Sequence, residues 1–141
     1  MSQLTLPAQL PHMRPMLDFA LEFAAGKGMT RRQLARLRLV AEELCVNICQ
    51  YAYGPSGGPM TLALGLSADG RYLLLRFADE GVPFNPLDVQ DERLAMPLEE
   101  RPAGGLGIYL VRTLACSARY RRAGEKNYLH LRMPLRGAED V

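Results

Sequence analysis

The sequence has few of the residues that build disulfide frameworks or zinc sites: three cysteines and two histidines among 141 residues. An odd number of cysteines, with no C-x-x-C pair, gives no disulfide framework. Zinc is disfavoured because both histidines lie far in sequence from Cys45 and Cys49. We therefore expect Cys45 to be a small core residue, and Cys49 and Cys116 to be free thiols.

Long apolar runs and a strong charge excess are lacking too. No run approaches the roughly 20 apolar residues that span a bilayer, and the opening segment MSQLTLPAQLPHMRPM does not have the pattern of a secretory signal. The net charge of +2 is too small to indicate a nucleic-acid partner. The local cluster Arg119, Arg121 and Arg122 is expected to be a solvated strand face. These absences predict a cytoplasmic protein with no membrane and no direct nucleic-acid partner.

What the sequence does contain fits a single globular domain over residues 1–141. Hydrophobic residues make up 48% of the chain and charged residues 23%, as in ordinary soluble proteins. Apolar residues three and four apart predict one helix ending at about Ala25 and another ending at about Tyr53. The second helix should begin after Thr30, which forms a capping box with Gln33. Its interior face is expected to comprise Leu34, Leu37, Ala41, Leu44, Cys45 and Ile48.

Alternating apolar residues predict the strands. One is expected around Leu62 to Leu66 and the next around Tyr72 to Phe77, joined by a tight turn at Asp69-Gly70. A short strand is expected at Leu4 to Leu6, and two more flank Gly124. Because strands are grouped rather than alternating with helices, we predict an α+β fold. It would be a two-layer sandwich in which helices cover one face of a mainly antiparallel (mixed) sheet.

Glycines open the last predicted helix, in GGLG from Gly104 to Gly107. Free backbone N–H groups and the positive end of a helix dipole bind phosphate, and glycine permits close approach. The pattern is neither the Rossmann nor the P-loop motif. Alone, such a cluster is more often a plain turn.

A carboxylate and a glycine follow the second predicted strand, in ADEGVPFNP. Asp79 in a half-buried pocket can accept a hydrogen bond from an exocyclic amine such as that of adenine, and Gly81 leaves room for a flat group. The plain alternative is an Asx-type turn at the end of the strand.

Glu43 and Asn47 lie one turn apart on the second predicted helix, about 40° from each other around its axis. An asparagine amide oxygen can bind Mg²⁺, which takes few protein ligands and otherwise uses phosphate oxygens. Glu43 can take a proton from an attacking hydroxyl or water. The plain alternative is a solvated polar face.

The order and spacing of these motifs resemble the GHKL (Bergerat-fold) ATPase superfamily. Within it, the sequence is similar to the small anti-sigma factor and serine/threonine kinase group of bacterial partner-switching systems. EELCVNICQYAYG looks like the N-box of that group, DEGVPFNP like its first glycine box and GGLGIYLVRTL like its second. The resemblance covers the chain from about Pro11 to Leu135. The PFNP segment makes the assignment to this subgroup more specific than the assignment to the superfamily.

The resemblance implies Glu43 as catalytic base, Asn47 as the Mg²⁺ ligand and Asp79 as the carboxylate that reads adenine, with Gly81 allowing close approach of the base. The resemblance also implies contacts to the ATP phosphates, from Gly104, Gly105, Leu106 and Gly107 along them and from Arg101 at the γ-phosphate. Residues 87–103 would form the lid over the phosphates. Two positions depart from the family pattern. Cys116 replaces a common aspartate, and Asn127 is the substitute for a small polar residue beside the adenine.

As a whole, the resemblance implies an ATP- and Mg²⁺-dependent kinase that phosphorylates a serine or threonine of a STAS-type antagonist. It would also bind a sigma factor or similar regulator, and form a homodimer through the sheet edge near the N-terminus. The alternative from another class is a nucleotide-gated partner-binding module without turnover. Glu43 argues against that alternative, because binding alone needs no base.

Overall fold

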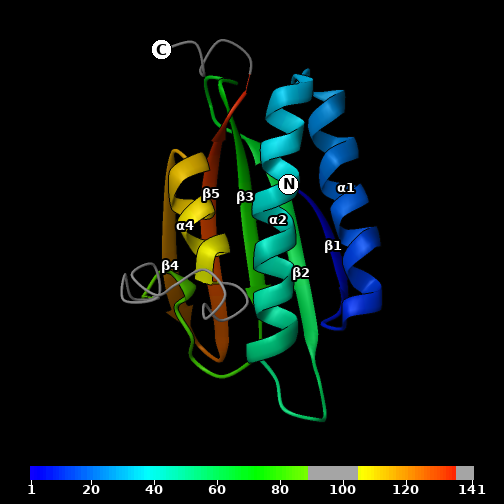
Figure 1. The fold of residues 1–141 in the computed structure, drawn as a ribbon, viewed down its shortest axis with the longest axis vertical. Coiled ribbons are helices and arrows are strands. Elements are labelled where there is room, and N and C mark those ends of the chain that lie inside the picture. The colour runs from blue at the N-terminus through cyan, green and yellow to red at the C-terminus, as the bar shows by residue number, and fades with distance from the viewer. Residues whose placement is uncertain (89–104, 136–141) are drawn as a thin grey trace.

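The computed structural model describes residues 1–88 and 105–135, which form a sheet covered by helices on one face (Figure 1). In chain order the elements are β1 (Ser2–Pro7), the 3-10 helix η1 (Leu10–His12), α1 (Met13–Gly26), α2 (Arg31–Tyr51), β2 (Pro59–Leu66), β3 (Tyr72–Asp79), the 3-10 helix η2 (Pro86–Asp88), α4 (Gly105–Leu114), β4 (Ser117–Ala123) and β5 (Lys126–Pro134). The predicted two-layer α+β fold is confirmed.

The five described strands are ordered β1-β2-β3-β5-β4, and each neighbouring pair is antiparallel. Two hairpins have glycine in the left-handed region: Gly70 between β2 and β3, with φ 72°, and Gly124 between β4 and β5, with φ 60°. A side chain would strain the backbone at both turns. Because β5 lies between β3 and β4, the end of β3 is next to the start of β5, and Asp79 is in register with Asn127.

The start of α2 is fixed by its own sequence. Thr30 Oγ1 accepts a hydrogen bond from the Gln33 backbone N–H (3.2 Å), and Gln33 Oε1 accepts one from the Thr30 N–H (2.9 Å). This is the predicted capping box. Gln33 is itself buried, and its amide Nε2 donates to the Leu135 carbonyl at 3.0 Å, which joins the helix start to the end of the sheet.

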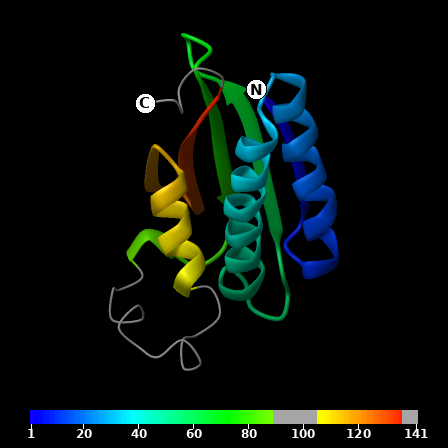
Figure 2. The same ribbon diagram turned by 45° about the horizontal axis from the view of Figure 1, so that its top comes forward.

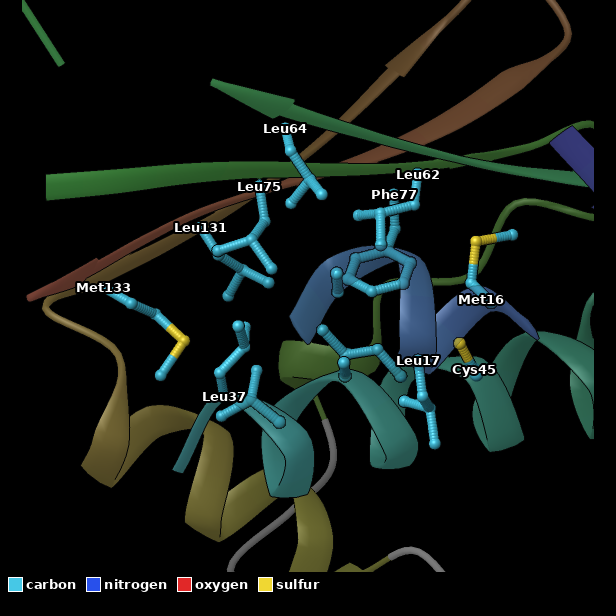
Figure 3. Close-up of a cluster of buried hydrophobic side chains, with 14 of the residues drawn as sticks. Met16, Leu17, Leu37, Cys45, Leu62, Leu64, Leu75, Phe77, Leu131 and Met133 are labelled. Carbon is cyan, nitrogen blue, oxygen red and sulfur yellow. The ribbon is translucent and has the colours of Figure 1, made fainter. Parts of the chain in front are cut away.

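The hydrophobic core lies between the sheet and the helices, as Figure 3 shows. Leu37, Ala41, Leu44 and Cys45 of α2 are buried as predicted, whereas Leu34 and Ile48 are only half-buried. Val40, which lies at the edge of this stripe on the side of Asn47, is buried as well. The reason is that α2 contacts α1 on one side and α4 on the other, so more than one stripe of it is covered. In the described part of the chain, no helix has the length and apolar character needed to cross a bilayer.

Candidate functional site

A pocket lies between α2 and the sheet and includes residues from the last part of α2. Figures 1 and 2 show that α2 ends and α4 begins at the same end of the molecule. Segments far apart in sequence form the pocket. Its lining residues are Leu44, Asn47, Ile48, Ala52, Phe77, Asp79, Phe84, Pro86, Tyr120, Asn127, Tyr128 and Leu129. The walls are largely apolar and aromatic, with a few polar groups, which is the usual composition of a small-molecule site.

Asp79 is the acidic residue of this pocket, and only 7% of it is exposed. Its Oδ1 accepts hydrogen bonds from the Gly81 backbone N–H (2.9 Å) and from Asn127 Nδ2 (2.8 Å). The bond from Gly81 is the Asx-type turn that the sequence offered as the plain alternative, so this turn is present. Both bonds go to one oxygen, however. Among the described residues, no hydrogen-bond donor to Oδ2 is found.

Asn127 holds Asp79 in place from the neighbouring strand. Besides its bond to Asp79, Nδ2 donates to the Val82 carbonyl at 2.8 Å. Its Oδ1 accepts from the Tyr120 hydroxyl (2.5 Å), with longer contacts from Arg122 Nη1 (3.3 Å) and the Phe84 N–H (3.4 Å). The Asn127 side chain is therefore engaged with the protein, and it orients the carboxylate rather than standing free as a ligand contact.

Gly81 is required by a contact within the protein. A Cβ at this position would lie 2.1 Å from the Ala52 carbonyl oxygen and 2.6 Å from its carbon. The next N–H, of Val82, donates to that same oxygen at 3.0 Å, and Arg122 Nη1 donates to the Gly81 carbonyl at 2.7 Å. The segment after β3 is thus clamped between the end of α2 and strand β4. The close approach that the structure shows at Gly81 is to Ala52.

Asn47 and Glu43 do not form a solvated polar face. Asn47 is 6% exposed and lines the pocket, while Glu43 is half-buried and its Oε1 atom is buried without a hydrogen-bond partner among the described residues. Desolvation, together with the charge of Glu42, raises the pKa of Glu43 to about 7, and the Asn47 amide offsets part of the rise. A carboxyl group poised near neutral pH beside a pocket is typical of a general base.

The remaining predicted site residues belong to the glycine motif and the lid. Gly105, Leu106 and Gly107 form the first turn of α4, where free backbone N–H groups occur. Gly104 and Arg101 lie outside the described residues, as do residues 89–103 of the predicted lid 87–103, whose first two residues belong to η2. The pocket therefore brings Asn47 and Asp79 together, with Glu43 one helical turn from Asn47.

A family model of the histidine kinase-like ATPase domain matches residues 6–133. The chain belongs to this family. Serine-protein kinase RsbW of Bacillus mycoides (strain KBAB4) is 28% identical over 121 residues, an alignment that covers 79% of this chain and 71% of the relative. RsbW of Bacillus cereus (strain G9842) is 28% identical over 116 residues, with the same coverage. The resemblance to the GHKL superfamily and its anti-sigma factor kinase group is confirmed.

Solved structures show the same fold. The RsbU and RsbW domains of Rv1364c from Mycobacterium tuberculosis match with a TM-score of 0.63 and 18% identity, covering 100% of this chain and 35% of that one. The blue-light activated histidine kinase of Erythrobacter litoralis matches with a TM-score of 0.59 and 18% identity, covering 80% of this chain. The chain of this ATPase family member spans about a third of the length of both structures.

Sequence reasoning did not assign Tyr53, Tyr120 and Arg122 to the site of this ATPase family member. The Tyr53 hydroxyl donates to the Pro59 carbonyl and accepts from the Glu80 N–H at 2.6 Å, so it joins the start of β2 to the segment after β3. Tyr120 and Arg122 alternate with Arg119 and Arg121 along β4 and therefore point to the helix-covered face. Strand alternation was the signal that separates Arg122 from the solvated cluster in which the sequence placed it.

Replacing Asn127 with alanine is expected to lower the free energy of unfolding of this ATPase family member by about 1–3 kcal/mol, because it removes one of the two donors to the buried Asp79 carboxylate and the Asn127 donor to the Val82 carbonyl. Urea denaturation measures the change. The exposed amide Gln50, replaced with alanine, is the control and should change stability by less than about 0.5 kcal/mol. Equal losses in the two variants would contradict the role of Asn127.

Proposed function

We propose that the chain binds ATP in this pocket with Mg²⁺. The supporting observation is the buried Asp79 carboxylate, oriented by Asn127 and Gly81 through one oxygen so that the other remains for an amine. The side chains of Phe77, Phe84 and Leu129 give flat and apolar walls suited to a purine. A buried anion that requires a hydrogen-bond donor selects adenine, since guanine places a carbonyl where adenine carries its amino group.

Asn47 fits the role of Mg²⁺ ligand. Its amide is buried in the pocket wall on the last part of α2, and a single oxygen ligand from the protein suffices where phosphate oxygens and water complete the octahedron. When bound, Mg²⁺ neutralises charge on the phosphates. The first turn of α4, with Gly105, Leu106 and Gly107, would present backbone N–H groups to the same phosphates, next to Gly104 and Arg101.

The proposed reaction is phosphoryl transfer to a protein hydroxyl. Glu43 would accept the proton as the hydroxyl oxygen forms its bond to the γ-phosphorus, and the bond from phosphorus to the bridging oxygen of ADP breaks. The half-buried carboxyl group is suited to this role because its pKa of about 7 lies near the operating pH. Such a reaction depends mainly on positioning and charge stabilisation, so few side chains suffice.

We further propose that the acceptor is a serine or threonine of a STAS-type antagonist, and that the protein alternately binds a sigma factor or similar regulator in the cytoplasm. The support is the family membership together with relatives named as serine-protein kinases. Dimerisation through the edge strand β1, the first strand of the sheet, belongs to the same proposal.

Incubation with γ-labelled ATP, Mg²⁺ and a STAS-type protein encoded nearby tests the kinase proposal. We expect label on that protein, and none on a variant in which the acceptor hydroxyl is replaced with alanine. The Asp79→Asn variant is the control for transfer that does not use the pocket, and it should transfer little label. ATP binding without any labelled product would refute the kinase proposal in favour of a nucleotide-gated binding module.

A further inference from the structure

The sheet has a second face, turned away from the helices, that the nucleotide site does not use. Along each strand, side chains alternate between the two faces, and the buried residues Leu73, Leu75 and Phe77 of β3 mark the face under the helices. In Figures 1 and 2 α1, α2 and α4 all lie on that side. The register places the following residues together on the opposite side, which we call the outer sheet face: Tyr72, Leu74, Arg76, Tyr128, His130, Arg132, Ser117, Arg119 and Arg121.

Positive charge is concentrated on the outer sheet face. Arg76, Arg119, Arg121 and Arg132 belong to it, and none of its positions carries a carboxylate. His130 pairs with Arg76 on one side and with Arg119 on the other, at the roughly 4.8 Å spacing of neighbouring strands. His130 thus separates Arg76 from Arg119, and the cations on neighbouring strands repel one another less where an anion covers them.

Two hollows on this face meet at His130. One is lined by Leu74, Ser117, Arg119, His130, Leu131 and Arg132, and the other by Arg76, Arg121, Ala123, Tyr128 and His130. The pKa of His130 is lowered by burial and then by the charges of Arg76, Arg119 and Arg121. Arg76 Nε is buried and has no hydrogen-bond partner among the described residues. The hollows are thus lined mainly by arginine side chains, which donate hydrogen bonds and carry positive charge, and one of them also by the apolar residue Leu74.

Aromatic rings on this face are already occupied by arginine side chains. The Arg76 guanidinium carbon lies 5.7 Å from the centre of the Tyr128 ring, and that of Arg132 lies 5.0 Å from the centre of Tyr72. Tyr128 also stacks with His130, at 6.3 Å between ring centres. Single-stranded nucleic acids need free ring faces for base stacking. The occupied rings therefore favour a protein anion.

We propose that the outer sheet face docks an acidic segment of a partner protein. Its carboxylates would take the guanidinium groups on either side of His130 as bidentate partners, and an aliphatic side chain would lie over Leu74. Because this face lies across the sheet from the helices, docking needs neither ATP nor Asp79, and the proposal can fail or hold independently of the kinase proposal.

Fluorescence anisotropy with a labelled twelve-residue peptide of alternating glutamate and leucine tests the proposal on the full chain without nucleotide. We expect saturable binding that weakens by about fivefold or more in the double variant Arg119→Gln/Arg121→Gln, since each exposed charge pair contributes about twofold or more to the affinity. Both side chains are exposed, so the variant should fold normally and keep its basal phosphoryl transfer.

The matched control is the double variant Arg14→Gln/Arg38→Gln, which removes the same charge from exposed positions on the helices. It should leave peptide affinity within about twofold of the parent protein. In the NMR spectrum, peptide binding should also raise the pKa of His130, because carboxylates then offset the surrounding arginines. Equal losses in the two double variants, or tighter binding of a single-stranded oligothymidylate of equal charge, would overturn the proposal.

Discussion

Glu43→Gln is expected to reduce phosphoryl transfer by about 10²–10⁴-fold, the usual contribution of a general base, while the affinity for ATP with Mg²⁺ changes by less than about threefold. The reason is that glutamine keeps the shape of the side chain and removes only its ability to accept a proton. Asn47 and Asp79, which are proposed to hold the nucleotide, stay in place. Single-turnover transfer and calorimetric binding measure the two quantities separately.

The pH dependence adds a second signature to this variant. The rate of the parent protein should rise with pH through about 7 and then level, because the base must be ionised, and this limb should be absent in Glu43→Gln. Stability changes in the opposite sense. The pKa of Glu43 lies above its ordinary value of 4.5, so the folded state binds the proton more tightly and loses stability as pH rises from about 4.5 to about 7. Glu43→Gln should therefore raise the melting temperature above pH 7 and have little effect below pH 4.5.

Glu42→Gln is the matched control. Its carboxylate is one of the causes that raise the pKa of Glu43, so removing it should preserve the rate at high pH and move the rising limb to lower pH. A Glu43→Gln variant that transfers phosphate at the full rate would show that another group, or none, acts as the base.

Among substitutions of nonpolar residues, Gly81→Ala is expected to weaken nucleotide binding most. The added methyl group would lie 2.1 Å from the Ala52 carbonyl oxygen, and backbone atoms at the end of α2 cannot move aside without breaking the Val82-to-Ala52 hydrogen bond. We expect a loss of about 1–3 kcal/mol in the free energy of unfolding. ATP affinity should fall at least about tenfold, because the Gly81 N–H that orients Asp79 is displaced.

Gly26→Ala is the comparison for this substitution. Its added Cβ would meet nothing within 4 Å at the end of α1, so the variant should be as stable as the parent protein, or slightly more stable. Urea denaturation and calorimetry on both variants measure the difference. If Gly81→Ala behaves like Gly26→Ala, the clamp between α2 and the segment after β3 does not position Asp79.

Local patterns in the sequence were sufficient to predict much of the fold. The Thr30 capping box, the Gly70 and Gly124 turns and the short first strand depend on neighbouring residues, and all are present. The boundaries were less accurate: α2 ends at Tyr51, two residues before the predicted end. Strand order depends on distant pairings, which no single stretch of sequence records. The insertion of β5 between β3 and β4 was therefore not predicted.

The candidate site shows the same division. Asp79, Asn47 and Glu43 could be named from motif spacing, but their burial could not, because it results from packing between α2, α4 and the sheet. The bond from Asn127 to Asp79 likewise follows from the register of β3 and β5. Sequence had marked Asn127 only as a departure from the family pattern. The contact of Gly81 with Ala52 joins two segments that are 29 residues apart in the chain.

Calorimetric titration of the parent protein and of Asp79→Asn with ATP and with GTP, in the presence of Mg²⁺, tests the central claim most directly. We expect ATP to bind the parent protein, GTP to bind at least about tenfold more weakly, and Asp79→Asn to lose about tenfold or more in ATP affinity, since a hydrogen bond to a charged group is worth about 1.5–3 kcal/mol. The exposed Asp18→Asn variant should bind ATP like the parent protein. No binding of ATP, or equal binding of ATP by Asp79→Asn, would contradict an adenine site at Asp79.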